Sequence, residues 1–198
     1  LAALDGVAGA AGVAWSEPQL VAHALATPND PGYIANQTWN YGLLNCPNAW
    51  DITTGSANTV LAVVDTGAFT DNFGVHAQIN DDLDANVGAD GYDFVSGTNN
   101  GDGNGLDPDP YDQGTFVGNS HHGSHCAGTM RARGNNGTQG TGINWDCTLM
   151  PIRALGTDGS GFTTDIADGI LYAAQIANSS GTLPANRAAV INLSLGLG

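Results

Sequence analysis

Short hydrophobic runs alternate with loops rich in glycine, asparagine and aspartate along most of this chain. The run TVLAVV at residues 59–64 is β-branched and apolar on both faces, which is typical of a fully buried strand. The same pattern predicts further strands at residues 91–95, 148–155 and 189–195. Strands that are apolar on both faces require a covering layer on each side.

Two segments between the predicted strands have helical character. Residues 122–133 are mostly small, and residues 164–178 place apolar side chains at helical intervals from Ile166 onward. Thr163 or Thr164 can cap the second of these helices. The alternation of strands and helices predicts an α/β fold with three layers, α/β/α, and a mainly parallel central sheet.

The charge balance excludes two classes of partner. Nineteen acidic residues stand against four arginines and no lysine, which gives a formal net charge of −15. Such a chain repels nucleic acid phosphates and anionic lipids. Its longest apolar runs are also far shorter than the roughly 18 residues that span a membrane. We therefore expect no nucleic acid and no membrane partner.

The acidic residues are almost all aspartates, since Glu17 is the only glutamate. Short carboxylates in glycine- and asparagine-rich loops suit Ca²⁺, and nine aspartates without a base lie within residues 81–112. We expect these charges to bind Ca²⁺; an acidic loop that is only solvated is the alternative. The candidate ligands there are Asp102, Asn104, Asp107, Asp109 and Asp112. Their spacing is not that of an EF-hand, which needs glycine at the sixth position and glutamate at the twelfth.

The three cysteines leave one thiol unpaired if the other two form a disulfide. We expect Cys46 and Cys147 to pair, because both lie at the edges of predicted ordered segments, and we expect Cys126 to pack as a free thiol. Two free buried thiols in place of the disulfide are the alternative. No Cys-x-x-Cys zinc pattern is present.

Asp65 lies where a carboxylate is costly, directly after five apolar strand residues. We therefore expect it to have a partner, although an aspartate that caps the following turn is the alternative. Asp-Thr-Gly is also the motif of aspartic proteases, which need two such carboxylates. The motif occurs only once in this sequence.

The segment SHHGSHCAGTM, residues 120–130, holds three histidines and a cysteine. Three interpretations are open: a general base at the start of a helix, a metal site, or helix capping. A zinc site would use His121 and His125, with or without Cys126, but it lacks the glutamate of the His-Glu-x-x-His motif.

Three motifs together resemble those of the subtilisin-like serine proteases, the subtilases. Asp65 in VVDTG, His122 in HHGSHCAGT and Ser194 in VINLSLG occur in the order and context of that family, and the resemblance extends from Thr27 to Gly198. It implies a subtilisin-like fold that is incomplete at the C-terminus. It also implies a secreted, extracellular serine endopeptidase with an Asp-His-Ser triad, monomeric when complete.

The resemblance assigns roles to Asp65 and to the three histidines. His122 would be the general base that takes the proton of the serine hydroxyl and returns it to the leaving amine. Asp65 would hold the imidazole in one tautomer and stabilise its charged form. His121 and His125 would then be structural or surface residues.

By the same resemblance, a polypeptide substrate adds as a strand between two backbone edges, with Leu155 and Leu195 lining apolar pockets. The residues of these edges are Gly159, Ser160 and Gly161, and Ser194, Leu195 and Gly196. Without the resemblance, residues 159–161 would be interpreted as a simple turn.

The resemblance also implies a second calcium site and a propeptide. Asp30 and Asp82 would bind Ca²⁺ together with Asn136 and carbonyl oxygens of the loop 134–140. Residues 1–26 resemble the tail of the family's inhibitory propeptide, with processing between His23 and Thr27, so the catalytic domain would comprise residues 27–198. The chain's own propeptide would then be a partner.

A subtilase also needs an oxyanion-hole asparagine and a Gly-Thr-Ser nucleophile motif. By the resemblance both would lie beyond Gly198, and this sequence contains neither. We therefore expect these 198 residues to be inactive alone. Two alternatives remain to the calcium-stabilised endopeptidase: a non-catalytic module that binds calcium and peptides, and a zinc-dependent hydrolase that uses the histidine cluster.

Overall fold

The computed structural model describes residues 10–14, 26–70, 80–84, 87–88, 90–97, 102–114 and 121–196. Most of the predicted propeptide tail, including the first part of the proposed processing region, residues 23–25, lies outside these ranges.

Four parallel strands form one sheet in the order β2-β3-β1-β4. The strands are β1 (Val60–Asp65), β2 (Tyr92–Asp93), β3 (Thr148–Arg153) and β4 (Val190–Asn192). All four predicted strands are present, although β2 and β4 are shorter than the apolar runs that indicated them. The α/β prediction with a parallel sheet is confirmed.

Six helical segments accompany the sheet in the described part of the chain. They are the π-helical η1 (Tyr33–Gln37), α2 (Thr38–Leu43), α3 (Cys46–Trp50), α4 (Asp81–Asp84), α5 (His122–Arg131) and α6 (Thr163–Ala173). Only α5 and α6 were predicted from the sequence. None of these helices has the length and apolar character needed to cross a membrane.

The ends of α6 differ from the prediction. Its N-cap is Phe162 and no side chain caps it, so the expected threonine cap is wrong. The helix stops at Ala173 instead of residue 178 because Gln175 adopts a left-handed conformation with φ of 60°. The N–H groups of Gln175 and Ile176 then bond back to the carbonyls of Tyr172 and Leu171, the hydrogen-bond pattern of a Schellman motif.

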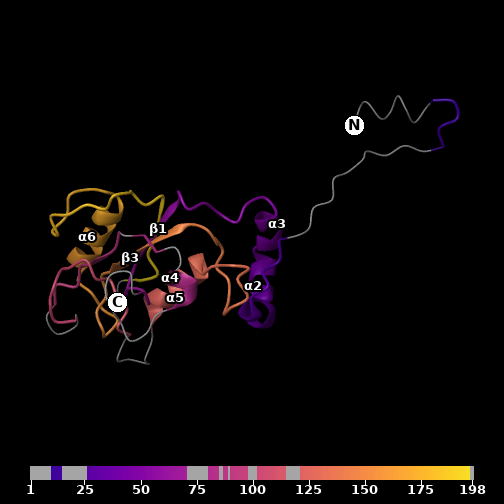
Figure 1. Ribbon diagram of the computed structural model, residues 1–198. Coiled ribbons are helices and arrows are strands. Elements are labelled where there is room, and N and C mark those ends of the chain that lie inside the picture. Colours follow the sequence, from indigo (N-terminus) through magenta and orange to yellow (C-terminus); the bar gives the residue numbers. More distant parts are fainter. Residues whose placement is uncertain are drawn as a thin grey trace.

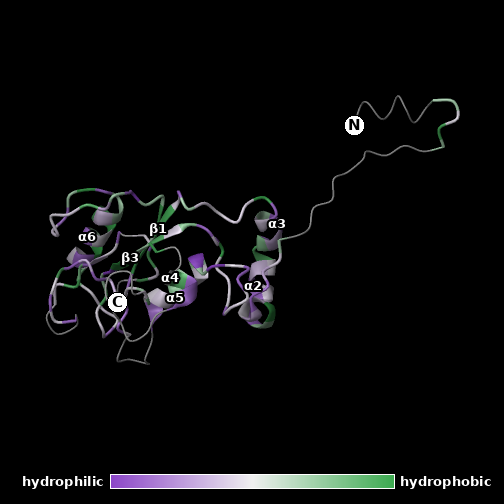
Figure 2. Cartoon of the chain, viewed as in Figure 1, coloured by the Kyte–Doolittle hydropathy of each residue, from purple (hydrophilic) through white to green (hydrophobic). Residues whose placement is uncertain are grey.

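The central strands are covered on both faces, which explains why β1 is apolar at every position before Asp65. Alternate residues of β1 pack on opposite sides: Val64 lies in one cluster with Tyr172 of α6, and Val63 lies in another with Ala127 of α5. Figure 1 shows α5 and α6 on opposite sides of β1 and β3. Figure 2 shows hydrophobic colouring concentrated on these strands. The result is the predicted three-layer arrangement.

The thiols of Cys46 and Cys147 are both free, so the predicted disulfide is wrong. Cys46 is buried in an aromatic cluster that also holds Tyr33, Tyr41, Trp50 and Trp145. Cys147 is fully buried just before β3, and burial raises the pKa of its thiol to about 11. Each thiol packs as a small apolar group, which is the alternative that the sequence left open.

Arg131, at the end of α5, is one of two arginines that are the largest fully buried side chains of the described residues. Its Nη1 donates to the carbonyl oxygens of Asp82 (2.9 Å) and Leu83 (2.8 Å), and its Nε donates to the carbonyl oxygen of Cys147 (3.1 Å). Burial lowers the pKa of this guanidinium from its ordinary value. Arg131 therefore ties α5 both to α4 and to the start of β3.

Replacement of Arg131 by methionine is expected to lower the free energy of unfolding by about 3 kcal/mol, because three buried carbonyl oxygens lose their donor. Urea denaturation followed by circular dichroism measures this change. The control is Arg133→Met, since the Arg133 side chain is exposed and its loss is expected to cost less than about 0.5 kcal/mol. Equal effects of the two replacements would contradict the role given to Arg131.

Candidate active site

Asp65 ends β1 and its side chain is fully buried. One carboxylate oxygen, Oδ1, accepts the N–H of Thr66 at 2.7 Å. The chain then turns at Gly67, whose φ of 102° is accessible to glycine with little strain. The strand therefore delivers a carboxylate to the carboxyl edge of the parallel sheet, where ligands bind in open α/β folds.

His122 begins α5, and the helix packs directly on the turn after Asp65. A Cβ atom on Gly123 would lie 3.0 Å or less from backbone atoms of Thr66 and Gly67, so only glycine permits this approach. The N–H of Gly123 donates to the hydroxyl of Thr66 at 2.8 Å. These contacts place the first side chain of α5 beside the end of β1.

Asp112 anchors the same helix start from a loop. Its Oδ2 accepts the N–H (3.1 Å) and the hydroxyl (2.7 Å) of Ser124, and its Oδ1 accepts the N–H of Gly114 (3.0 Å). A buried carboxylate at the N-terminus of a helix is favourable because of the free N–H groups and the helix dipole. Asp112 was predicted as a calcium ligand. No role was predicted for Thr66 or Gly123, and of these two only Gly123 carried a signal in the sequence, as the glycine that follows His122.

Asp65 and His122 form a hydrogen-bonded pair. The Nδ1 atom of His122 lies 2.8 Å from Oδ1 and 3.0 Å from Oδ2 of Asp65. The carboxylate is fully buried while the imidazole is 46% exposed. A carboxylate on Nδ1 favours the tautomer that carries its proton there, which leaves Nε2 free to accept another proton. The arrangement can therefore act as a general base.

Cys126 lies one helical turn after His122, with its Sγ 3.9 Å from Nδ1 and 4.0 Å from Nε2 of the imidazole. Burial raises the pKa of this thiol, against a smaller opposing effect of a hydrogen bond with the side chain of Ser194. The reactive form of cysteine is the thiolate. A raised pKa therefore disfavours Cys126 as a nucleophile beside the pair.

The ligands of the alternative zinc site, His121, His125 and Cys126, are not brought together. His121 lies against the ring of Phe69, with its Nδ1 3.7 Å from Asp112, and His125 lines a cavity on α5 that also borders Thr141. Among the described residues, the only three potential ligand groups within reach of one ion are those of Asp65, His122 and Cys126. The three histidines therefore lie in separate environments.

The two predicted substrate edges follow the strands that flank β1. β3 leads to residues 154–161 and β4 leads to residues 193–196, so both segments border the end of β1. The N–H of Leu155 bonds to the carbonyl oxygen of Asp65 at 3.1 Å, and the Leu155 side chain is buried. Gly159, Ser160, Gly161, Ser194 and Gly196 are exposed, and Leu195 is half-buried. The parallel order β3-β1-β4 thus places an exposed backbone segment on each side of Asp65.

The predicted calcium ligands of the acidic loop divide into two groups. Asp112 faces α5, as described above. Burial, together with the charges of Asp102 and Asp109, raises the pKa of Asp107, whose Oδ2 is buried with no hydrogen-bond partner. A buried arginine from β3 also enters the loop: Arg153 Nη1 lies 2.8 Å from Asp93 and 3.5 Å from Asp102. The sequence segment 81–112 lacks a base, but the fold supplies one from outside it.

The ligands predicted for the second calcium site, Asp30, Asp82 and Asn136, lie close together. Asp30 is fully buried and accepts the N–H groups of residues 135–137. The Oδ1 atom of Asp82 accepts the amide of Asn136 at 2.7 Å and the hydroxyl of Thr138 at 2.9 Å. The other oxygen, Oδ2, is buried with no hydrogen-bond partner. A buried carboxylate oxygen without a donor is costly, and a cation would satisfy it.

Comparison with known proteins gives one consistent family. The model of the subtilase family matches residues 56–197. The chain is 40% identical over 199 residues to an extracellular protease of Xanthomonas campestris pv. campestris, with 92% of this chain and 32% of that protein covered. It is 38% identical over 186 residues to a thermophilic serine proteinase of Bacillus sp. (strain AK1), with 93% and 37% covered.

A solved structure is also similar. The protease of Pseudoalteromonas arctica PAMC 21717 superposes with a TM-score of 0.74 at 39% identity, over 86% of this chain and 51% of that one. The chain spans about a third of the length of the two curated relatives and about half of the solved chain.

Proposed function

The chain belongs to the subtilase family, and on that basis we propose that it supplies the base and the orienting carboxylate of a secreted serine endopeptidase that hydrolyses polypeptides. The observation that supports this most strongly is the Asp65–His122 pair, with Nδ1 and Oδ1 at 2.8 Å, at the carboxyl edge of the sheet. Three relatives are named as extracellular proteases, and we propose the same location for this protein.

In the proposed mechanism, Nε2 of His122 takes the proton of a serine hydroxyl while the serine oxygen bonds to the scissile carbonyl carbon. The imidazolium then protonates the leaving amine as the C–N bond breaks, and a water repeats the sequence to release the acyl group. Asp65 remains ionised and stabilises the imidazolium. We propose that the serine and the oxyanion-hole donors come from sequence outside these 198 residues, and that these residues alone do not cleave peptides.

Substrate would bind along the backbone edges on either side of Asp65. Exposed main-chain groups of residues 159–161 and 194–196 would pair with an extended peptide, as in strand addition. A Cβ on Gly161 would collide with the carbonyl of Ala154, so glycine keeps this edge free of side chains.

Ca²⁺ would bind at the second predicted site, where Asp30, Asp82 and Asn136 come together. The unpartnered oxygen of Asp82 supports this assignment. The ion would supply electrostatic stabilisation by joining the segment before η1 to the loop 134–140. The acidic loop around Asp107 is proposed as a weaker calcium site: Oδ2 of Asp107 is also buried with no hydrogen-bond partner, but Arg153 neutralises part of the charge of the loop.

Residues 1–26 are proposed as the tail of an inhibitory propeptide and residues 27–198 as part of the catalytic domain. The propeptide would then be an intramolecular partner, and the complete protein is proposed to be a monomer.

Labelling with a serine-directed fluorophosphonate tests the proposed function in the complete protein. We expect one serine to be modified and proteolysis to be abolished, while a zinc chelator leaves activity unchanged. Inactivation by zinc removal without labelling would support the zinc alternative, with Asp65, His122 and Cys126 as ligands. Calcium and peptide binding without cleavage or labelling would support the non-catalytic module.

A further inference from the structure

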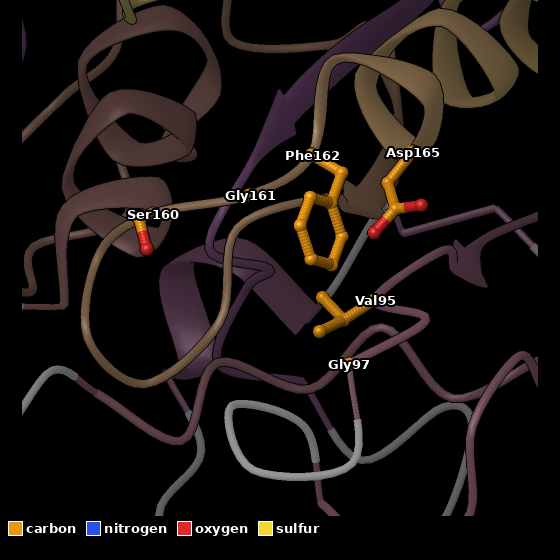
Figure 3. A pocket seen from close by; sticks show the side chains of 6 residues that line it. All are labelled: Val95, Gly97, Ser160, Gly161, Phe162 and Asp165. Atoms are coloured by element: carbon orange, nitrogen blue, oxygen red, sulfur yellow. The ribbon is translucent and has the colours of Figure 1, made fainter. Parts of the chain in front are cut away.

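A small hollow opens beside the proposed substrate edge, at the start of α6 (Figure 3). Its volume is about 100 Å³. The residues that line it are Val95, Gly97, Ser160, Gly161, Phe162 and Asp165. Neither the proposed catalytic mechanism nor the calcium site uses it.

The polar group of the hollow is the carboxylate of Asp165, whose side chain is buried at 6% exposure. Ser96 holds this carboxylate in place: its N–H donates to Oδ2 at 3.1 Å and its hydroxyl lies 2.9 and 3.0 Å from the two oxygens. Asp165 is in the first turn of α6, where a negative charge interacts favourably with the helix dipole. The hydroxyl of Thr164 also donates to Oδ1, at 3.5 Å. A carboxylate has about four acceptor positions, so it retains capacity for a further donor.

Asp165 has no cationic partner within the described part of the chain, where no arginine or histidine nitrogen lies within 4 Å of its carboxylate. The whole sequence has four arginines, no lysine and a net charge of −15. The negative charge of the hollow is therefore available to a cation from another molecule.

The walls formed by Val95 and Phe162 are apolar. The ring of Phe162 is 63% exposed although it is large and aromatic, and it lies across the hollow from Val95 with Asp165 beside both (Figure 3). An alkyl chain that ends in a positive charge fits these walls, because its stem can pack on the ring and on Val95 while its cationic end reaches the carboxylate.

Ser160 and Gly161 belong both to this hollow and to the proposed substrate edge. A peptide that pairs with this edge therefore passes the rim of the hollow. We propose that the hollow is a specificity site that binds a lysine or arginine side chain of the polypeptide substrate through Asp165 and Phe162. This inference rests on the proposed endopeptidase function.

The test uses the complete protein and peptides in which one position at a time is lysine, arginine or norleucine. Norleucine has the alkyl stem of lysine without its charge. At one position on the peptide, we expect kcat/KM for lysine or arginine to exceed that for norleucine by roughly tenfold. Because the attraction is electrostatic, this ratio is expected to fall as salt is added.

Asp165→Asn keeps an oxygen acceptor for Ser96 but removes the charge. We expect it to abolish the roughly tenfold preference while changing kcat/KM for the norleucine peptide less than about twofold. Phe162→Ala, at an exposed position, is expected to lower the preference by roughly threefold. The matched control is Asp168→Asn, which removes the same charge from the next turn of α6, outside the hollow, and is expected to keep the preference.

Two results would overturn the inference: no peptide position at which the unaltered protein prefers a basic residue, or equal preferences in Asp165→Asn and Asp168→Asn. A melting temperature for each variant distinguishes lost folding from lost preference, and Phe162→Ala remains informative if Asp165→Asn unfolds. Failure of the unaltered protein to cleave any peptide is a different result, which would overturn the proposed function and this inference with it.

Discussion

Replacement of His122 by alanine is expected to lower kcat of the complete protein by about 10⁶-fold, the magnitude known for the catalytic histidine of subtilisin, a member of the same family. The physical reason is that no other side chain in the described residues combines a free imidazole nitrogen with a buried carboxylate at 2.8 Å. Hydrolysis of a chromogenic peptide, with single-turnover kinetics for the slow variant, measures the loss. Folding is expected to be retained, because the His122 side chain is 46% exposed.

The matched control is His125→Ala, which removes an exposed imidazole one turn further along α5. We expect it to change kcat by less than about tenfold, since His125 has no contact with Asp65 among the described interactions. A loss in His125→Ala as large as in His122→Ala would show that the base had been assigned to the wrong histidine.

The pair was predicted from the resemblance to the subtilases, because the local signals at each residue left alternatives open. Asp65 follows a fully apolar strand, where a carboxylate needs a partner, and His122 begins a helix of small residues. Parallel strands with helices on both sides follow from the same hydrophobic runs. What joins the two residues could not be read locally, since the approach of α5 to β1 depends on Gly123 against Gly67 and on a cap from Asp112.

The acidic loop shows what a count of charges along the sequence leaves out. Nine aspartates without a base in residues 81–112 indicated a cation, yet the fold brings Arg153 from β3 to Asp93 and Asp102. Burial still raises the pKa of Asp93 to about 7, because the loss of solvent outweighs the attraction of Arg153. A partner separated by 60 residues in the sequence is invisible to any local count.

The predicted disulfide failed for a related reason. Cys46 and Cys147 both lie at element boundaries, and that was the only sequence evidence for pairing. In the structure Cys46 instead packs with aromatic rings, and Cys147 offers its carbonyl oxygen to Arg131. Proximity of two cysteines depends on tertiary packing, which spacing along the chain does not determine.

Removal of calcium is expected to lower the melting temperature of the protein by about 5–10 °C. A ligand that binds only the folded state adds about 2.7 kcal/mol at a concentration of 100 times its Kd, and each kcal/mol corresponds to about 2–4 °C in a domain of this size. The expected cause is the buried Oδ2 of Asp82, which has no donor to replace the ion. Differential scanning calorimetry with saturating Ca²⁺ or with a chelator measures the shift.

Two aspartate variants locate the ion that causes this shift. Asp82→Asn is expected to melt at about the same temperature with calcium and with chelator, because the ion loses a charged ligand. Asp109→Asn, in the acidic loop, keeps an acceptor for the N–H of Tyr111 and is expected to retain the full shift.

The opposite pattern would place the ion in the loop, where Arg153 would then have to share Asp102 with it. An unchanged melting temperature in the unaltered protein would mean that the buried carboxylates of Asp30 and Asp82 are stabilised by their N–H, amide and hydroxyl donors alone.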